Sequence, residues 1–196
     1  LNYVPVSPPE AFWRQLQYNE FDVSELSCAN YFTLLSRGDK RFIAISVYPS
    51  RTFRHSAVYV NTASGIKRPE DLRGKRVGCA EYGMTMAIWQ RAFLQHDYGV
   101  APGDMRWVLG GLEQPGRRER IRAEPPKAIQ VEQAPPDRSL SDLLLAGELD
   151  ALLSPHMPHI FRRADPRIAR LFPDFWNVER EYYRKLLTSM KKHKIA

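Results

Sequence analysis

Two arginines and a histidine stand within five residues of each other, at Arg51, Arg54 and His55. A guanidinium binds a carboxylate through two parallel hydrogen bonds, and an imidazole transfers protons near neutral pH. The cluster lies between two strand-like runs, 42–48 and 57–60, and so occupies a loop at a strand terminus. Open α/β sheets bind ligands at such termini. The cluster therefore predicts either a clamp for an anionic ligand or a set of solvated loop charges.

A second group of candidates lies between a predicted strand at 75–80 and a predicted helix at 85–98. Glu81 has the chemistry of an acid or base, and Tyr82 offers a ring and a hydroxyl. Backbone amides at the start of a helix favour an anion. In the alternative interpretation, Thr85 only caps the helix and Glu81 is solvated.

Ser27 lies at another junction between a predicted strand, 21–24, and a predicted helix, 26–36. Its hydroxyl could cap the helix, donate to a ligand carboxylate, or do both. The glycine-rich stretch 110–117 could wrap a ligand or form a plain surface turn.

His156 and His159 follow a predicted strand at 150–154. Their spacing could hold a metal on a helix, but Pro158 interrupts it and no carboxylate stands nearby in the sequence. We therefore expect no metal here and retain His156 as a pocket residue. The sequence contains no nucleophile elbow, Walker loop or dinucleotide-binding fingerprint.

Strands alternate with helices along the whole chain, which predicts an α/β fold with a largely parallel sheet. The predicted strands are 2–6, 21–24, 42–48, 57–60, 75–80, 105–109, 128–131, 150–154 and 168–172. The predicted helices are one beginning at Pro8 and those at 26–36, 85–98, 140–146 and 177–187, with helical turns at 69–74 and 158–163.

The composition is that of a globular protein, with 43% hydrophobic and 26% charged residues among 196. The net charge is +7, but the basic clusters of the chain, at 117–122 and 191–194, lack interleaved aromatics, which disfavours nucleic acid as a partner.

No apolar run reaches the roughly 18 residues of a membrane span. Cys28 and Cys79 fit no metal spacing, and we expect both to be reduced, buried thiols.

Two pieces of sequence are specific, Ser-Arg-Thr-Phe-Arg-His-Ser at 50–56 and Glu-Tyr-Gly-Met-Thr at 81–85. A third, Asp-Leu-Arg-Gly-Lys-Arg-Val-Gly at 71–78, is shared by many binding proteins and says little about function. With further pieces at 21–27 and 110–117, the chain resembles the 4,5-dihydroxyphthalate decarboxylase family. The resemblance extends from about residue 2 to about residue 185.

This resemblance implies a fold like that of the type 2 periplasmic binding proteins, with two lobes that each contain a mostly parallel sheet. It implies that 1–62 form part of the first lobe, 63–166 the second lobe, and 167–196 a return segment with an atypical tail. Family members are longer at both ends. The resemblance thus implies an apparently truncated chain with an incomplete first lobe, which could be inactive as this fragment.

The implied activity is the non-oxidative decarboxylation of a dihydroxylated aromatic dicarboxylate to a catechol acid, the reaction of a carboxy-lyase in phthalate degradation. We expect no cofactor. The expected proton-transfer groups are His55 first and Glu81 second. The other expected site residues clamp the carboxylates or wall the ring of a small aromatic carboxylate: Ser27, Arg51, Arg54, Tyr82, Thr85, Trp107 and His156.

A substrate-binding protein of an ABC-type transporter is the alternative, because the same arginines would capture a small carboxylate without chemistry. We expect a cytoplasmic location for the enzyme and a periplasmic one for the solute-binding protein. The sequence leaves a homo-oligomer open.

Overall fold

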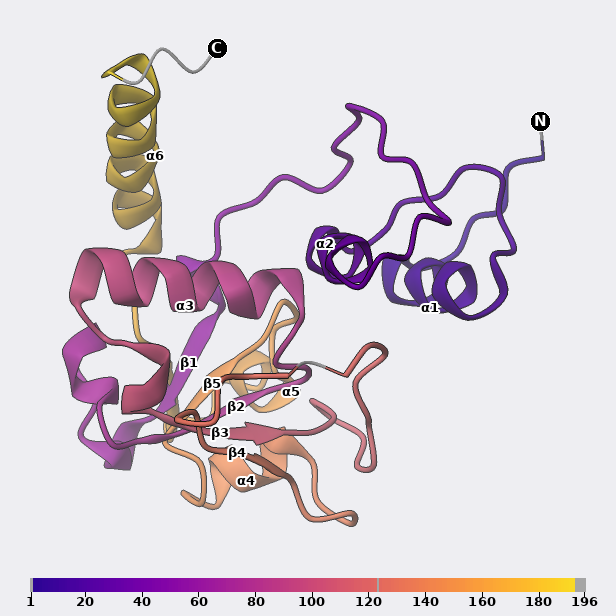
Figure 1. Cartoon of the computed structure of the whole chain (residues 1–196). Coiled ribbons are helices and arrows are strands. Elements are labelled where there is room, and N and C mark those ends of the chain that lie inside the picture. Colours follow the sequence, from indigo (N-terminus) through magenta and orange to yellow (C-terminus); the bar gives the residue numbers. More distant parts are fainter. Residues whose placement is uncertain (1, 123, 193–196) are drawn as a thin grey trace.

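The computed structural model describes residues 2–122 and 124–192, and a six-stranded sheet is its centre (Figure 1). The strand order is β4-β3-β2-β5-β1-β6. The strands are β1 (Val58–Asn61), β2 (Arg76–Cys79), β3 (Arg106–Leu109), β4 (Val131–Gln133), β5 (Ala151–Leu153) and β6 (Ile168–Arg170). The pairs β2–β3, β3–β4 and β2–β5 are parallel, whereas β1 is antiparallel to β5 and β6. The predicted α/β class with a mostly parallel sheet is confirmed.

Helices cover both faces of the sheet, because the strands bury side chains on both sides (Figure 1). Val58 and Val60 of β1 join the core on the side of α3 (Thr85–Tyr98) and α6 (Phe175–Lys192). Tyr59, which points the other way, packs with α4 (Leu140–Leu145) and α5 (His159–Arg162). This alternation is the two-residue period of a strand.

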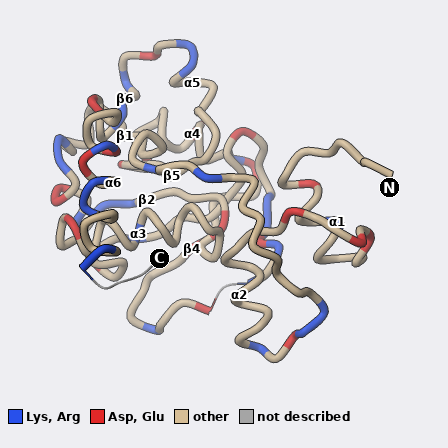
Figure 2. Tube along the Cα trace, turned by 90° about the horizontal axis from the view of Figure 1, so that it is seen from above, with Lys and Arg blue, Asp and Glu red and all other residues tan. Residues whose placement is uncertain are grey.

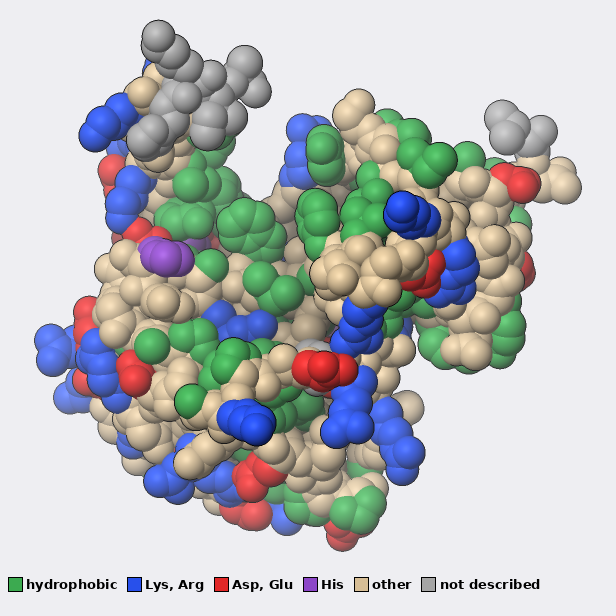
Figure 3. Space-filling view, in the orientation of Figure 1, with side chains coloured by type: hydrophobic (Ala, Val, Ile, Leu, Met, Phe, Trp, Pro, Cys, Tyr) green, Lys and Arg blue, Asp and Glu red, His purple; other side chains and the backbone are tan. Residues whose placement is uncertain are grey.

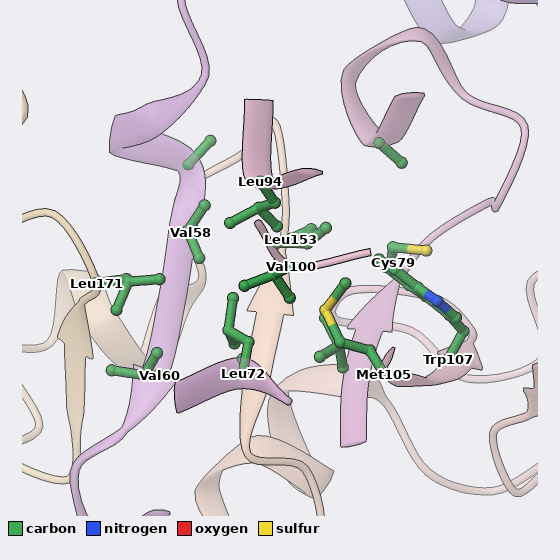
Figure 4. Close-up of a cluster of buried hydrophobic side chains, with 14 of the residues drawn as sticks. Val58, Val60, Leu72, Cys79, Leu94, Val100, Met105, Trp107, Leu153 and Leu171 are labelled. Atoms are coloured by element: carbon green, nitrogen blue, oxygen red, sulfur yellow. The ribbon is translucent and has the colours of Figure 1, made fainter. Parts of the chain in front are cut away.

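The larger core joins the sheet to α3 (Figure 4). Val58 and Leu153 come from neighbouring strands, and Leu94 comes from α3. All three are at most 1% exposed. Burying such a side chain contributes about 1.5–3 kcal/mol, so this layer anchors the loops at the ends of the strands.

Helix α3 has the bounds that the sequence predicts. It ends where Gly99 adopts a left-handed conformation with φ 68° and donates its N–H to the carbonyl of Gln95. A residue with a Cβ is sterically strained in this conformation, which explains why the helix ends here.

The other helices, α1 (Pro8–Tyr18) and α2 (Cys28–Ser36), belong to the N-terminal arm, residues 2–54.

Short 3-10 turns link the strands at η1 (His55–Ala57), η2 (Thr62–Ser64), η3 (Pro69–Leu72) and η4 (Pro102–Asp104). Ser139 caps α4 as predicted, since its side chain accepts a hydrogen bond from the N–H of Asp142.

The predicted strands at 2–6, 21–24 and 42–48 are wrong, because the arm has no strand. The run 42–48 alternates correctly, but Ile43 and Ile45 are 90% and 63% exposed. A strand needs a neighbour to pair its N–H and C=O groups, and the described residues offer none beside this run. Figure 3 shows hydrophobic side chains on both sides of the hollow between the arm and α6.

Strands from all three predicted segments share the sheet. Val58–Asn61 lies in the predicted segment 1–62, and Ile168–Arg170 lies in the predicted segment 167–196. The division of the chain into two lobes and a return segment stays a prediction, and residues 1 and 193–196 of its outer segments lie outside the described residues.

Lys and Arg are dispersed along the chain, as the sequence indicates (Figure 2). In residues 2–122 and 124–192, no helix combines the length and apolar character that crossing a membrane requires.

Candidate functional site

Most of the predicted site residues belong to the loops and turns at one edge of the sheet. The parallel strands β2, β3 and β5 end there, at Cys79, Leu109 and Leu153. Strand β1 runs the opposite way, so its first residue, Val58, lies beside Leu153. The N–H of Ser154 donates to the carbonyl of Ala57 over 3.1 Å. The arginine loop before β1 therefore lies beside the turn after β5 and at the same edge of the sheet as the turns after β2 and β3. Ligands bind at this edge in open α/β sheets.

At the turn after β2, Glu81 is 2% exposed and forms two ion pairs. Its Oε1 accepts from Arg117 Nη2 over 2.5 Å and from Arg120 Nη1 over 2.8 Å. A buried carboxylate needs such partners, because desolvation disfavours an unpaired charge. The structure therefore places Glu81 in an ion-pair cluster, and the alternative of a solvated side chain is wrong.

The next residues of this turn present their backbone amides to a carboxylate. The N–H groups of Tyr82 and Gly83 both donate to Oε1 of Glu119, over 2.6 and 3.2 Å. Glu119 belongs to the loop after β3, 36–37 residues further along the chain. The predicted anion preference of these amides is thus met within the chain.

Ser27 and Thr85 lie together, with 3.0 Å between their side-chain oxygens. Ser27 caps α2 by accepting from the N–H of Asn30, and Thr85, the first residue of α3, accepts from the N–H of Ala29 over 3.1 Å. The hydroxyl of Thr85 therefore serves α2 and does not cap its own helix. The N-termini of α2 and α3 meet here, and both helix dipoles favour an anion at this point.

His55 is buried in a cage of aromatic rings. Its imidazole stacks on Phe93 with 4.1 Å between ring centroids and meets Phe172 and Tyr182 edge-on. Its Nδ1 has no hydrogen-bond partner and lies 4.0 Å from Oε1 of Glu179. Burial lowers the pKa of the imidazole to about 4, so His55 is neutral at pH 7.

The two arginines of the loop differ in exposure. Arg51 is exposed, whereas Arg54 is partly buried. Burial lowers the pKa of the Arg54 guanidinium, and the charge of Glu179 opposes this effect. The carbonyl of Arg54 accepts from Nε2 of Gln90 over 3.0 Å, which ties the loop to α3. Glu179 also accepts from the N–H groups of His55 and Ser56, over 3.1 and 3.2 Å.

Trp107 and Tyr82 contact each other edge-on, with ring centroids 5.5 Å apart. Trp107 is fully buried and donates its ring N–H to the carbonyl of Pro102 over 2.9 Å. It contacts the candidate site through the Tyr82 ring and the guanidinium of Arg91, which lies 5.5 Å from its ring centroid. His156 is exposed in the turn after β5 at the same edge, and its carbonyl accepts from the hydroxyl of Ser154 over 2.7 Å.

Sequence reasoning missed four charged residues of this edge. Arg117, Arg120 and Glu119 surround the turn after β2, and Arg91 of α3 lies over the Tyr82 ring at 3.7 Å. The signal was present in the run Arg-Arg-Glu-Arg at 117–120, where one acid interrupts a basic cluster. No group of three or more metal-binding side chains occurs in the described part of the chain.

A cavity of about 670 Å³ opens at the opposite edge of the sheet, where strands β2, β3 and β4 begin. Arg76, Arg106 and Lys127 are among its lining residues. It lies away from every predicted site residue except Trp107. We place the candidate site at the other edge, because the buried ion pairs and paired amides converge there.

The mostly parallel sheet fits the fold of periplasmic binding proteins, and a sequence comparison shows that the chain is of this class. The family described as "ABC transporter, phosphonate, periplasmic substrate-binding protein" matches residues 1–114. A 4,5-dihydroxyphthalate decarboxylase of Comamonas testosteroni is 41% identical over 185 residues, which are 93% of this chain and 56% of the relative. A protein of the same name from Pseudomonas putida is 38% identical over 91% of this chain and 69% of the relative.

The chain belongs to the 4,5-dihydroxyphthalate decarboxylase family, as the sequence motifs indicated. It spans about half the length of the first of these relatives.

Proposed function

We propose that this chain binds a dihydroxylated aromatic dicarboxylate at the candidate site and removes one carboxylate as CO₂ without oxidation. The observation that carries the proposal is the convergence of cationic side chains and helix N-termini at one sheet edge. Arg54 enters this edge before β1, and Ser27 and Thr85 bring the N-termini of α2 and α3 to it. The names of the two relatives supply the substrate class.

The chemistry needs one group to hold the substrate and another to move protons. In 4,5-dihydroxyphthalate, each carboxylate is para to a hydroxyl. Deprotonation of that hydroxyl pushes electron density to the carbon that carries the carboxylate. A proton is added to this carbon, the bond to the carboxylate breaks and releases CO₂, and the electron pair of that bond restores the aromatic ring. Reprotonation of the phenolate gives 3,4-dihydroxybenzoate. Binding and orientation supply much of the acceleration.

Arg51 and Arg54 are the proposed clamp for the carboxylate that stays, with the hydroxyls of Ser27 and Thr85 nearby. His55 is neutral at pH 7, so it suits removal of the phenolic proton better than donation of one. Its Nδ1 makes no hydrogen bond and lies 4.0 Å from Oε1 of Glu179. Glu81 is ion-paired with two arginines, which makes it the weaker proton-transfer candidate.

Tyr82, Trp107 and His156 are proposed to shape the pocket around the ring. Tyr82 is 7% exposed and Trp107 supports it from the core. His156 comes from the turn after β5, so it would approach the ring from a different side.

The solute-binding function is the second candidate, and two observations favour it. The matching family is described as a periplasmic substrate-binding protein. In addition, the two proposed proton-transfer groups are engaged elsewhere, His55 in an aromatic cage and Glu81 in ion pairs. Such a protein would bind the same dicarboxylate and leave it intact.

Incubation of the chain with 4,5-dihydroxyphthalate distinguishes the decarboxylase from the solute-binding protein. We expect CO₂ and 3,4-dihydroxybenzoate in equal amounts, at a rate that falls at least about a hundredfold in His55→Phe while binding persists. Arg54→Gln should weaken binding by about tenfold or more, because it removes a charged hydrogen-bond donor. The matched control is Arg68→Gln, whose side chain is 74% exposed at the opposite edge. Saturable binding without any product would overturn the enzyme and favour the solute-binding protein.

A further inference from the structure

A carboxylate already occupies the turn between β2 and α3, and it comes from the chain itself. Oε1 of Glu119 accepts from the N–H of Tyr82 over 2.6 Å and from the N–H of Gly83 over 3.2 Å. Two successive amides that converge on one oxygen form a concave anion site. They precede a 14-residue helix, whose dipole adds to their attraction for negative charge.

Arg91 gives an independent sign that this turn is built for an anion. Its guanidinium lies over the ring of Tyr82 at 3.7 Å, and the residue is only 8% exposed. Its Nη1 has no hydrogen-bond partner. A buried guanidinium with an unused donor is costly, and an anion within reach of Nη1 would remove that cost.

The charges around the turn are unequal. Arg91, Arg117 and Arg120 bring three positive charges, whereas Glu81 and Glu119 bring two negative ones. Glu81 is 2% exposed and fixed by two arginines. Glu119 is partly exposed, so it is the carboxylate that can leave without stranding a buried charge.

We propose that the amides of Tyr82 and Gly83 form a carboxylate subsite that Glu119 fills when no ligand is bound, and that a ligand carboxylate takes its place. This inference rests on the proposed function for the class of ligand, an aromatic carboxylate. It adds an internal competitor, because Glu119 and the ligand cannot both use the same two donors. The apparent affinity is then the intrinsic affinity multiplied by the fraction of molecules in which Glu119 has left the subsite.

The test uses phthalate, a dicarboxylate without the hydroxyl groups that the decarboxylation needs. We expect ¹⁵N-resolved titration of the chain to shift the amide signals of Tyr82 and Gly83. Glu119→Ala should bind phthalate about tenfold more tightly than the unmodified chain, and Glu119→Gln should lie between the two, since it keeps a neutral acceptor. Glu124→Ala is the matched control, because Glu124 is on the same loop with an 82% exposed side chain.

Equal phthalate affinities of the unmodified chain and both Glu119 variants would overturn the subsite, as would unshifted signals of Tyr82 and Gly83. Circular dichroism of Glu119→Gln establishes that the comparison is made on folded protein. Phthalate binding with these changes but no product from 4,5-dihydroxyphthalate would refute the enzyme and support the subsite. Product formation without shifts of the Tyr82 and Gly83 amide signals would support the enzyme and refute the subsite.

Discussion

The buried imidazole of His55 predicts that the protein loses stability as the pH falls from about 6.5 to about 4. The side chain is 2% exposed and stacks on Phe93, so water cannot solvate a charged form. The carboxylate of Asp97 favours the charged form, but burial outweighs it and lowers the pKa of His55 to about 4. In the unfolded chain, the imidazole has an ordinary pKa of about 6.5.

The direction of this change in stability with pH follows from proton uptake. Between pH 6.5 and 4, the unfolded chain binds a proton at His55 that the folded protein does not bind, so unfolding becomes more favourable as pH falls. A pKa that falls from 6.5 to about 4 corresponds to at most about 3.5 kcal/mol, at about 1.4 kcal/mol per pH unit. Asp165, whose pKa Arg167 lowers to about 2, loses its contribution only below about pH 4 and does not affect this window.

Urea denaturation at pH 7, 6, 5 and 4.5 measures the effect. The free energy of unfolding should fall with pH in the unmodified chain and stay nearly constant over this range in His55→Phe, which fits the aromatic cage without a titratable group. His156→Phe should retain the unmodified pH dependence, because this histidine is exposed. The same pH dependence in His55→Phe as in the unmodified chain would refute the assignment.

Three further predictions concern the surroundings of the site. Glu81→Gln should lower the free energy of unfolding by about 3 kcal/mol, because it leaves two guanidiniums facing a buried neutral group, whereas the exposed Glu148→Gln should change it by less than about 1 kcal/mol in the same urea titration. Thr85→Val removes the acceptor that holds α2 against α3, so limited proteolysis after residue 36 should become severalfold faster, and an unchanged rate would contradict the contact. A thiol reagent at pH 8 should modify one cysteine per chain, the exposed Cys28, because burial raises the pKa of the Cys79 thiol to about 12; modification of two would show that Cys79 is accessible.

Local signals explain why the sheet and its helices could be predicted. Helix α3 has a broad apolar face and a glycine at its end, and its bounds were predicted correctly. The strands of the sheet are short apolar runs that pack between two layers of helices, so propensity and tertiary context agree.

The arm shows where the local signal was not enough. The run 42–48 has the alternation of a strand, but alternation does not supply a pairing partner. The expectation of two buried thiols also failed for Cys28, the first residue of α2, which is exposed.

The candidate site was predictable as a set of loops and less so as a set of contacts. Strand order brings the loop at 51–57 and the turn at 81–85 to the same edge of the sheet, where the alternation of strands and helices predicted a site. The ion pairs of Glu81 with Arg117 and Arg120 join residues 36–39 positions apart, and no local pattern specifies them. The burial of His55 depends on Tyr182, which follows more than a hundred residues later.

Mapping the binding of 4,5-dihydroxyphthalate by ¹⁵N-resolved titration tests the central claim most directly. The account predicts that the shifted amides cluster at the edge formed by 51–57, 81–85, 110–120 and 154–156. Shifts confined to the opposite edge, around the cavity of about 670 Å³ lined by Arg76, Arg106 and Lys127, would contradict it.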